Sequence, residues 1–377
     1  MRVLSILTTL TTGGAETLVT NLAGEFVRRG HDALVVSLSD ADQVGNPVEI
    51  ERSMKTRLRS DGALFTSLAL ASRANLAKGA WRLRRAIRDF APDVIHAHTA
   101  RAVPMLALAG VRVPVVLTHH NTRLSFPPWA YRLFDRTVTG NVAISAECEA
   151  QTRALSRRPV RRIANAADPR FRVERPRIAP ADRPLVLAVG TPSRQKDYPT
   201  LVRAARPLRE ALGRDVTIRI AGGGAELPAL RALVEEVGAG DIVELLGPRS
   251  DMPDLMRQAD LLANSSLWEG FAIAMIEASM AALPIVATDV NGSRELVENG
   301  RNGLRVPVGD PQALGEAIAR VLGDADLYAA MSAAALEAGK AFGIEHCAAA
   351  HLDWYRQLSG NASQRASRRA FESAAGA

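Results

Sequence analysis

Residues 265–278 read Ser-Ser-Leu-Trp-Glu-Gly-Phe-Ala-Ile-Ala-Met-Ile-Glu-Ala, and this stretch decides the fold. Two glutamates, Glu269 and Glu277, bracket seven residues that begin with a Gly-aromatic pair and continue as a predicted helix. Ile273 and Ile276 repeat at helical spacing, and Glu277 lies about 40° from Ile273 on a helix with roughly 100° per residue. A carboxylate beside a core-facing stripe is costly unless another group pairs with it.

Two interpretations of these glutamates stay open on spacing alone. Glu269 lies in the loop that feeds a helix predicted to start near Phe271, so both carboxylates are placed to meet one ligand at the N-terminal end of the helix. There the backbone N–H groups of Phe271, Ala272 and Ile273 would point at an anion. In the alternative, Glu269 caps the helix and Glu277 is a satisfied core residue.

A longer segment carries a family resemblance. Residues 265–296, SSLWEGFAIAMIEASMAALPIVATDVNGSREL, resemble the signature of the family 4 retaining glycosyltransferases, whose mark is E-x7-E in a second nucleotide-binding domain. The resemblance implies that Glu269 and the amides of Phe271 and Ala272 hold the donor sugar. It implies that Glu277 holds the ribose hydroxyls of the nucleotide. Because a carboxylate accepts two hydrogen bonds from a vicinal diol, both roles are chemically sound.

The N-terminal segment predicts a strand–helix–strand unit. Residues 2–7 and 33–38 are predicted strands, and Gly13-Gly14-Ala15-Glu16 opens the helix between them, which implies a parallel sheet. Two glycines at a strand-to-helix turn let a ligand approach the backbone closely. GGAE is similar to the family's loop near the donor diphosphate, which implies that Gly13 and Gly14 lie at the donor phosphates.

Two later strands are predicted to end in histidines, at His96-x-His98 and at His119-His120. Polar groups at the carboxyl ends of parallel strands are where such folds bind ligands. We expect these spacings to put neighbouring histidines on opposite faces of a strand, which argues against a metal cluster. The family comparison aligns His120 with a histidine at the donor sugar, and His98 resembles the common H-x-H ending of an earlier strand.

The loop that ends at Lys196 carries the predicted phosphate contacts. In the family, an Arg directly after the preceding Gly and a Lys a few residues on clamp the donor phosphates, but here Thr191 occupies the Arg position. Arg194 is predicted to substitute for it, giving two cations that stabilise a diphosphate leaving group; the alternative is a solvated loop charge. Two further departures are Ala166 and Ala282, which stand where the family often has Gly.

Composition places the chain among soluble globular proteins. Of the 377 residues, 47% are hydrophobic and 23% are charged. Two cysteines, Cys148 and Cys347, suit a reducing cytosol, and Met1-Arg2 leads straight into a strand-like run, so we expect a cytoplasmic protein without a secretory leader. Residues 102–117 are broken by prolines and an arginine, which argues against an integral membrane protein. With 5% aromatic residues and no recognised motif, nucleic acid is not an expected partner.

The net charge of +7 has two interpretations. All but four of the 47 basic residues are arginine, which a coding preference would explain. The alternative is attraction to an anionic membrane surface on its inner face. A predicted helix over residues 73–90 has a basic amphipathic pattern of the kind that lies on membranes, although an ordinary solvated face has the same pattern. Its cations are Arg82, Arg84, Arg85 and Arg88.

The order of predicted strands and helices gives two doubly wound, Rossmann-like α/β domains. We predict an N-terminal acceptor-side domain over residues 1–175 and a nucleotide-sugar domain over 183–345, with a proline- and arginine-rich linker between them. A helix over about 348–361 is expected to cross back to the first domain, and residues 362–377 are expected to be disordered. Residues 40–62 are interpreted as a loop.

The resemblance implies the GT-B fold, in which two such domains face each other across a cleft. It implies a hexosyltransferase-type enzyme that moves a sugar from a UDP- or GDP-sugar to a glycan or lipid-linked acceptor, as in cell-surface polysaccharide biosynthesis. Retention of configuration, no resident cofactor and no required metal are implied as well; no Asp-x-Asp motif stands where a metal-dependent enzyme would need one. The alternatives are a sugar-nucleotide epimerase of the same architecture and a non-catalytic nucleotide-sugar-binding module.

Overall fold

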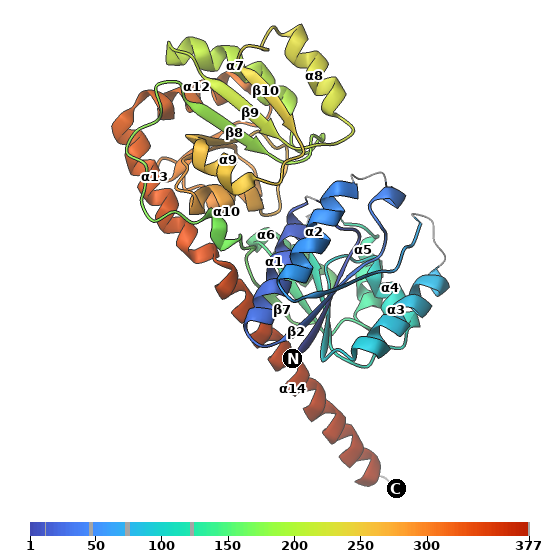
Figure 1. Ribbon diagram of the computed structural model, residues 1–377. Helices are drawn as coiled ribbons and strands as arrows, with labels where there is room; N and C mark the ends of the chain where they lie inside the picture. Colours follow the sequence, from blue (N-terminus) through green and yellow to red (C-terminus); the bar gives the residue numbers. More distant parts are fainter. Residues whose placement is uncertain (12, 45–47, 72–75, 121–123, 376–377) are drawn as a thin grey trace. The chain divides into compact units, whose positions relative to one another are not determined.

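The computed structural model of the chain describes all residues except 12, 45–47, 72–75, 121–123 and 376–377, and it describes no side chains for 44 and 361–375. Two compact units follow from the contacts (Figure 1). The first contains Met1–Thr11, Ala15–Ala164 and Ile344–Ala377, and the second contains Asn165–Gly343 together with Gly13 and Gly14.

The boundary between the units differs from the predicted linker at residues 171–183. The chain changes unit between Ala164 and Asn165. The segment after Asn165 is already fastened to the second unit, because the N–H of Val173 donates to the carbonyl of Met280 at 3.0 Å. The Arg and Pro residues that suggested a linker therefore lie on the surface of a packed segment.

The first unit is built on a sheet of seven parallel strands in the order β3-β2-β1-β4-β5-β6-β7. The chain starts in the middle at β1, runs outward to β3, and then returns to β4 on the other side of β1. Such a reversal leaves a crevice at the carboxyl ends of β1 and β4, where doubly wound folds bind ligands. The strands are β1 (Arg2–Leu7), β2 (Asp32–Ser37), β3 (Leu64–Ser67), β4 (Val94–Ala97), β5 (Val115–His119), β6 (Gly140–Ala143) and β7 (Val160–Arg162).

Helices cover both faces of this sheet. One face packs against α3, α4 and α5, and the other carries α1 and α14, whose Phe26 and Tyr355 rings meet edge-on with centroids 6.2 Å apart. The helices are α1 (Gly14–Arg28), α2 (Val48–Ser60), α3 (Leu76–Phe90), α4 (Ala102–Leu108), α5 (Pro128–Phe134), α6 (Ala146–Leu155) and α14 (Ile344–Ala375), with a 3₁₀ turn at Asp42–Val44.

Three sequence-based expectations for this unit need correction or qualification. Most of the segment interpreted as a loop over 40–62 is helix α2, in which Glu51 pairs with Lys55 one turn on at 3.1 Å. Helix α14 continues to Ala375, where disorder was expected after residue 361, because this segment consists largely of good helix formers. The predicted start of α3 at residue 73 lies outside the described residues.

The second unit repeats the same design with six parallel strands in the order β10-β9-β8-β11-β12-β13. Its chain reversal lies between β8 and β11. The strands are β8 (Leu185–Val189), β9 (Thr217–Ala221), β10 (Val243–Gly247), β11 (Leu261–Asn264), β12 (Ile285–Thr288) and β13 (Gly303–Val306). The helices are α7 (Tyr198–Leu212), α8 (Leu227–Glu236), α9 (Met252–Gln258), α10 (Ile273–Met280), α11 (Asn291–Leu296), α12 (Pro311–Gly323) and α13 (Ala325–Gly339), with 3₁₀ turns at Pro169–Phe171 and Lys340–Phe342.

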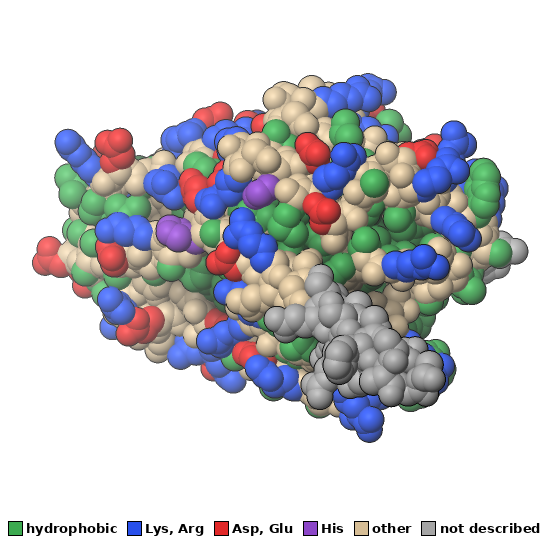
Figure 2. All heavy atoms as spheres, turned by 90° about the horizontal axis from the view of Figure 1, so that it is seen from below, with side chains coloured by type: hydrophobic (Ala, Val, Ile, Leu, Met, Phe, Trp, Pro, Cys, Tyr) green, Lys and Arg blue, Asp and Glu red, His purple; other side chains and the backbone are tan. Residues whose placement is uncertain are grey.

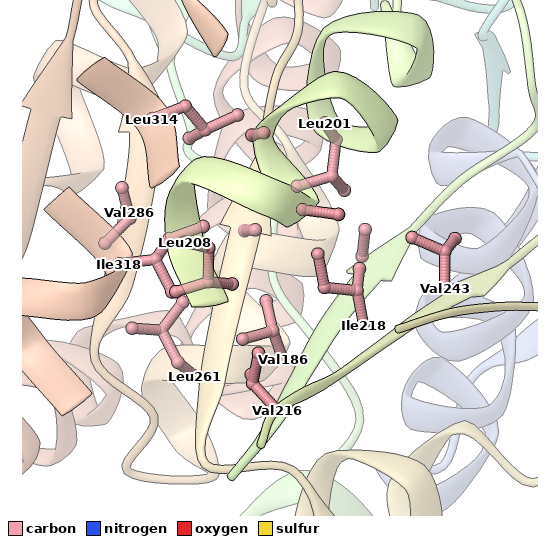
Figure 3. Packing of buried hydrophobic residues seen from close by; sticks show 14 of the residues in the cluster. Val186, Leu201, Leu208, Val216, Ile218, Val243, Leu261, Val286, Leu314 and Ile318 are labelled. Carbon is pink, nitrogen blue, oxygen red and sulfur yellow. The ribbon is translucent and has the colours of Figure 1, made fainter. Parts of the chain in front are cut away.

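The core of the second unit lies between the sheet and helices α7 and α12 (Figure 3). Leu208 of α7 and Ile318 of α12 are fully buried among strand residues such as Val186 and Ile218. Strands buried on both faces read as continuous apolar runs, which is why β8 could be recognised in the sequence. The predicted class of two doubly wound parallel sheets is confirmed.

No helix in the described part of the chain has both the length and the apolar character needed to cross a bilayer.

Candidate functional site

The central motif lies at the chain reversal of the second unit. Strand β8 ends at Val189 and feeds the loop that contains Lys196, while the neighbouring β11 ends at Asn264 and feeds the loop that contains Glu269. Both loops therefore leave the carboxyl edge of the sheet at the position where open α/β sheets bind ligands. Helix α10 begins directly after the second loop, at Ile273.

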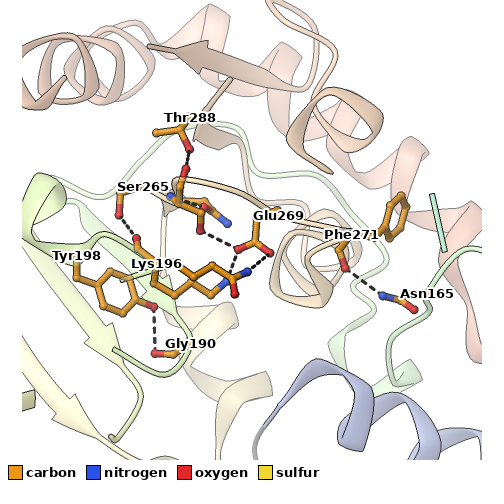
Figure 4. Close-up of polar contacts among 11 residues, drawn as sticks. Asn165, Gly190, Lys196, Tyr198, Ser265, Glu269, Phe271 and Thr288 are labelled. Atoms are coloured by element: carbon orange, nitrogen blue, oxygen red, sulfur yellow. Dashed lines mark hydrogen bonds and ion pairs between the residues drawn. The ribbon is translucent and has the colours of Figure 1, made fainter. Parts of the chain in front are cut away.

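The carboxylate of Glu269 is the centre of a polar cluster (Figure 4). Its Oε1 lies 2.5 Å from Nζ of Lys196 and accepts a hydrogen bond from Oγ of Ser266 at 2.7 Å. Its Oε2 accepts from the side-chain amide of Gln195 at 3.3 Å. The two ionised side chains are 7% and 17% exposed for Glu269 and Lys196, so each charge depends on the other for compensation.

The capping interpretation of Glu269 is excluded by this geometry. The N-cap residue of α10 is Ala272 and not Glu269, and both carboxylate oxygens of Glu269 accept from side chains of other residues. The oxygens of Glu269 are instead directed at the loop after β8.

Two further hydrogen bonds tie the loops together. Oγ of Ser265 donates to the carbonyl of Lys196 at 2.8 Å, and the N–H of Leu267 donates to the carbonyl of Gln195 at 2.8 Å. Because the backbones on both sides are fixed, Lys196 and Glu269 are held in register by the fold as well as by their charges.

Glycines make room for this pair. Gly190 has a φ of 144°, and a Cβ there would lie 2.7 Å from Cε of Lys196. A Cβ on Gly292, at the start of α11, would lie 2.8 Å from the carbonyl oxygen of Glu269. Gly292 therefore excludes larger residues for a steric reason, because the atom it would meet is backbone, while at Gly190 the positive φ favours glycine and a side chain would displace Lys196.

Helix α10 spans Ile273–Met280, so it begins two residues later than expected, and Phe271 and Ala272 precede it. Ile273 and Ile276 are buried as predicted, but the helix is almost completely enclosed. Glu277 is 7% exposed within it. The first N–H groups of any helix lack partners inside the helix, which gives this end a preference for anions.

The two departures at glycine positions have different structural consequences. Ala282 follows α10 with a φ of 57°, a left-handed conformation that glycine adopts freely, which accounts for the family's preference. Ala166 is buried and is not among the described residues with positive φ, so alanine fits there.

In the first unit, histidines gather at the carboxyl ends of β4 and β5. Nδ1 of His98 lies 2.9 Å from Nε2 of His120, and the two rings stack with centroids 5.2 Å apart. The rings of His96 and His98 lie 3.9 Å apart, so the expectation that these two point to opposite faces is wrong. Residues two apart on a strand share a face. His119 instead meets Tyr131, with ring centroids 5.0 Å apart.

Burial decides the charge state of these histidines. Burial, with smaller contributions from His119 and His351, lowers the pKa of His120 to about 3. Burial also lowers the pKa of His98 well below its usual value. Both rings are therefore neutral at physiological pH and act as hydrogen-bonding groups. Among the described residues, no group of three or more His, Cys, Asp or Glu side chains has an arrangement that could hold a metal ion.

Two family models match this chain and together span residues 12–338. "Glycosyltransferase Family 4" matches residues 12–171, and "Glycosyl transferases group 1" matches residues 171–338. The chain belongs to glycosyltransferase family 4. The resemblance recognised in the E-x7-E segment is thereby confirmed, and the enzyme is a glycosyltransferase with the GT-B fold.

Individual relatives of this family 4 enzyme match along most of its length. It is similar to alpha-D-kanosaminyltransferase of Streptomyces kanamyceticus, with 29% identity over 86% of this chain and 94% of the relative. It is 27% identical to 2-deoxystreptamine N-acetyl-D-glucosaminyltransferase of Streptomyces fradiae, over 86% of each chain. Its fold is similar to that of Anabaena HepE, solved in complex with UDP and glucose, with a TM-score of 0.79, 23% identity and coverage of 95% of this chain and 100% of that one.

Of the predicted site residues of the family 4 enzyme, Gly14 lies beside the start of α10, since a Cβ there would be 3.4 Å from Cδ1 of Ile273. Lys196 and Glu269 meet directly, which the sequence did not predict. Arg194 is exposed, and its backbone N–H donates to a carboxylate oxygen of Glu226 at 3.1 Å. Gly13 immediately precedes α1, and Gly14 is its first residue.

Sequence reasoning missed Gln195 and Ser266, the two neutral partners of Glu269. Their positions in the sequence pointed weakly to the site, since Gln195 precedes Lys196 and Ser266 lies three residues before Glu269. The signal is weak because nothing in the sequence shows that the two loops leave neighbouring strands.

Proposed function

We propose that this enzyme transfers a hexose from a UDP- or GDP-sugar to a glycan or lipid-linked acceptor, with retention of configuration and without a required metal, in cell-surface polysaccharide biosynthesis. The observation that carries the proposal is the buried Lys196–Glu269 pair beside the N-terminal end of α10, at the chain reversal of the second unit. Anabaena HepE, which shares the fold, was solved with UDP and glucose, and this supports a UDP-sugar donor.

Each predicted residue receives a role in this proposal. Lys196, with Arg194 from the same loop, neutralises the diphosphate, and the backbone at Gly13 and Gly14 approaches it closely. Glu269 and the amides of Phe271 and Ala272 bind the donor sugar. Glu277 binds the ribose hydroxyls, and His120 contacts the sugar as a neutral hydrogen-bonding group.

The proposed reaction is attack on the donor from the side that the nucleotide leaves. The bond between the anomeric carbon and the phosphate oxygen breaks, the acceptor oxygen bonds to the same face of that carbon, and the proton of the acceptor passes to the departing phosphate oxygen. Lys196 stabilises the negative charge that grows on the diphosphate. Since Lys196 is also paired with Glu269, a bound donor must share or replace that ion pair.

Three experiments test this proposal. In a thermal-shift screen of sugar nucleotides, the true donor should raise the melting temperature, because it binds the folded chain only. Incubation with that donor alone then separates the alternatives: an epimerised donor identifies an epimerase, and binding with neither transfer nor hydrolysis identifies a binding module. Transfer should survive excess EDTA, and a complete loss that Mg²⁺ or Mn²⁺ restores would overturn metal independence.

A second class of acceptor is favoured by the names of the two full-length relatives. The relative from S. fradiae is named for 2-deoxystreptamine, a cyclitol, and kanosaminyltransferase is named for an amino sugar. Free and amino-substituted cyclitols therefore join lipid-linked glycans as candidate acceptors, each to be tested for transfer with the donor that the thermal-shift screen identifies. Transfer to a cyclitol only would replace polysaccharide biosynthesis by the modification of a small molecule.

The proposal includes peripheral binding to the anionic inner face of the membrane through α3. Lys78, Trp81, Arg85 and Arg88 lie within one sector of this helix, and Trp81 is 63% exposed. Asp89 lies beside them and pairs with Arg85 at 3.7 Å and with Arg88 at 2.8 Å, which partly neutralises this face. An exposed indole on a basic amphipathic face is still typical of a helix that lies in a membrane interface. On the face shown in Figure 2, basic side chains are spread out with acidic ones among them. The membrane proposal therefore rests on the exposed face of α3 and not on the net charge of the whole chain.

Vesicle co-sedimentation tests the membrane proposal. Binding to vesicles that contain anionic lipid should fall as salt rises, at roughly 1 kcal/mol per engaged cation at low salt. Replacing Trp81 by Ala should weaken binding without changing its dependence on salt. If the enzyme binds neutral and anionic vesicles equally, the membrane proposal is wrong and coding preference explains the net positive charge.

A further inference from the structure

Helix α14 carries three buried side chains that face the sheet of the first unit. Cys347, His351 and Tyr355 are spaced four residues apart and are each at most 5% exposed. Nδ1 of His351 lies 2.8 Å from the carbonyl of Cys347, and because a carbonyl only accepts, this nitrogen carries the proton. Tyr355 reaches further, to the histidines at the end of β4.

The imidazole of His96 is held at both nitrogens. Its Nδ1 lies 2.6 Å from the hydroxyl of Tyr355, and its Nε2 lies 2.7 Å from the hydroxyl of Thr118 on β5. Hydroxyls both donate and accept, so the two contacts are compatible with either neutral tautomer. Together they fix the plane of a ring that has no exposed surface.

This fixed ring supports the pair next to it. His96 packs against His98 with centroids 3.9 Å apart and ring planes tilted by 35°, and His98 is hydrogen-bonded to His120. In the described part of the structure, the buried Nε2 of His98 has no hydrogen-bond partner, and a buried polar atom without a partner is costly. The orientation of His98 therefore decides where an uncompensated polar atom points.

We propose that Tyr355 and His96 are positioning residues: the hydroxyl of Tyr355 fixes the ring of His96, which in turn fixes the orientation of the His98–His120 pair. The C-terminal helix is then part of the active-site support as well as of the packing. The catalytic consequence rests on the proposed function, in which His120 contacts the donor sugar. The structural consequence does not depend on it.

The test uses variants that remove one hydroxyl and keep the shape of the side chain. Tyr355→Phe removes the partner of Nδ1 of His96, and Thr118→Val removes the partner of Nε2. Tyr328→Phe is a matched control in the second unit, where another fully buried tyrosine donates its hydroxyl to the carbonyl of Asp260 at 3.0 Å. The readouts are the ¹⁵N signals of the histidine rings in the substrate-free full-length enzyme, and kcat and KM with the donor identified by the thermal-shift screen.

We expect Tyr355→Phe and Thr118→Val to shift the ring signals of His96, His98 and His120. We expect both to lower kcat by about 10- to 100-fold with little change in KM for the donor, as is usual when a reacting group is misplaced slightly. Tyr328→Phe should leave the same signals and kcat unchanged. Unchanged signals of His98 and His120 in both test variants would overturn the positioning role, whatever the activity. Shifted signals with unchanged kcat would confine the role to structure and refute its catalytic consequence.

Discussion

Replacing Lys196 by methionine removes the positive charge from the centre of the site while keeping most of the volume of the side chain. Glu269 would keep the hydrogen bonds from Ser266 and Gln195, but its carboxylate would lose its only charged partner among the contacts described. Breaking a buried ion pair from one side costs about 3–5 kcal/mol. Since Lys196 is 17% exposed and two hydrogen bonds remain, we expect about 2–3 kcal/mol here.

The assay must read the two units separately, because a chain of two units does not unfold in one step. Hydrogen exchange followed by mass spectrometry gives the opening free energy peptide by peptide. Peptides from β8, β11 and α10 should lose protection in Lys196→Met, while peptides from β1 and β4 should not. A matched control is Arg209→Met, which breaks an exposed ion pair with Asp241 in the same unit and should cost less than about 1 kcal/mol.

A double-mutant cycle decides whether the pair itself is responsible. Glu269→Gln keeps a hydrogen-bonding side chain of the same shape, and in combination with Lys196→Met it leaves no buried charge behind. The loss of unfolding free energy in the double variant should therefore be about 1–2 kcal/mol smaller than the sum of the losses in the two single variants. Simple addition of the two effects, or a cost of Lys196→Met no larger than that of Arg209→Met, would show that the buried pair does not stabilise the site.

Further predictions concern binding, turnover and stability. Glu277→Ala should weaken the binding of bare UDP or GDP in calorimetry, because Glu277 is assigned to the ribose. Arg194→Ala should lower kcat about 100-fold, on the scale of losing one transition-state donor. Burial lowers the pKa of His119 and of His351 from 6.5 to about 4, so the first unit should keep its stability above pH 6.5 and lose about 1.4 kcal/mol per histidine for each pH unit below it, seen as a falling urea midpoint. Ala91→Gly should raise the stability of the first unit by about 1 kcal/mol in urea unfolding, because this exposed residue after α3 has a φ of 46°.

Each of these predictions has a contrary outcome. If Glu269→Ala abolishes nucleotide binding and Glu277→Ala spares it, the two roles are exchanged. If Arg194→Ala turns over like the parent at all donor concentrations, the residue is a solvated loop charge; Thr191→Arg, which restores the family's cation, should otherwise recover part of the loss. A urea midpoint that stays flat from pH 6.5 to 4.5 would contradict neutral buried histidines. Ala86→Gly, inside α3, should destabilise where Ala91→Gly stabilises.

The sequence was sufficient for the parts of the fold that depend on local pattern. Apolar runs such as residues 185–189 predicted buried parallel strands, and the alternation of strands and helices predicted two doubly wound units. Helix α2 was missed because most of its residues are polar and only Glu51 and Leu58 are buried, so the sequence shows no clear apolar stripe at helical spacing. The domain boundary was misplaced because composition does not show that Val173 pairs with Met280.

In the candidate site, too, features that depend on local sequence could be predicted and contacts between distant segments could not. Glu269, Glu277 and Lys196 were recognisable because their spacing is specific to the family. The ion pair between Lys196 and Glu269 joins loops that are 73 residues apart in the chain, and only the pairing of β8 with β11 brings them together. Likewise, the contact of Tyr355 with His96 spans 259 residues and depends on α14 packing against the sheet of the first unit.

The most direct test of retaining, metal-independent sugar transfer is a ¹H NMR time course with the donor found by the thermal-shift screen, an acceptor and excess EDTA. We predict release of the nucleoside diphosphate together with a product whose anomeric proton has the same configuration as the donor, and no such product with Lys196→Met. Formation of an epimerised donor, or of a product with inverted configuration, would contradict the proposed reaction.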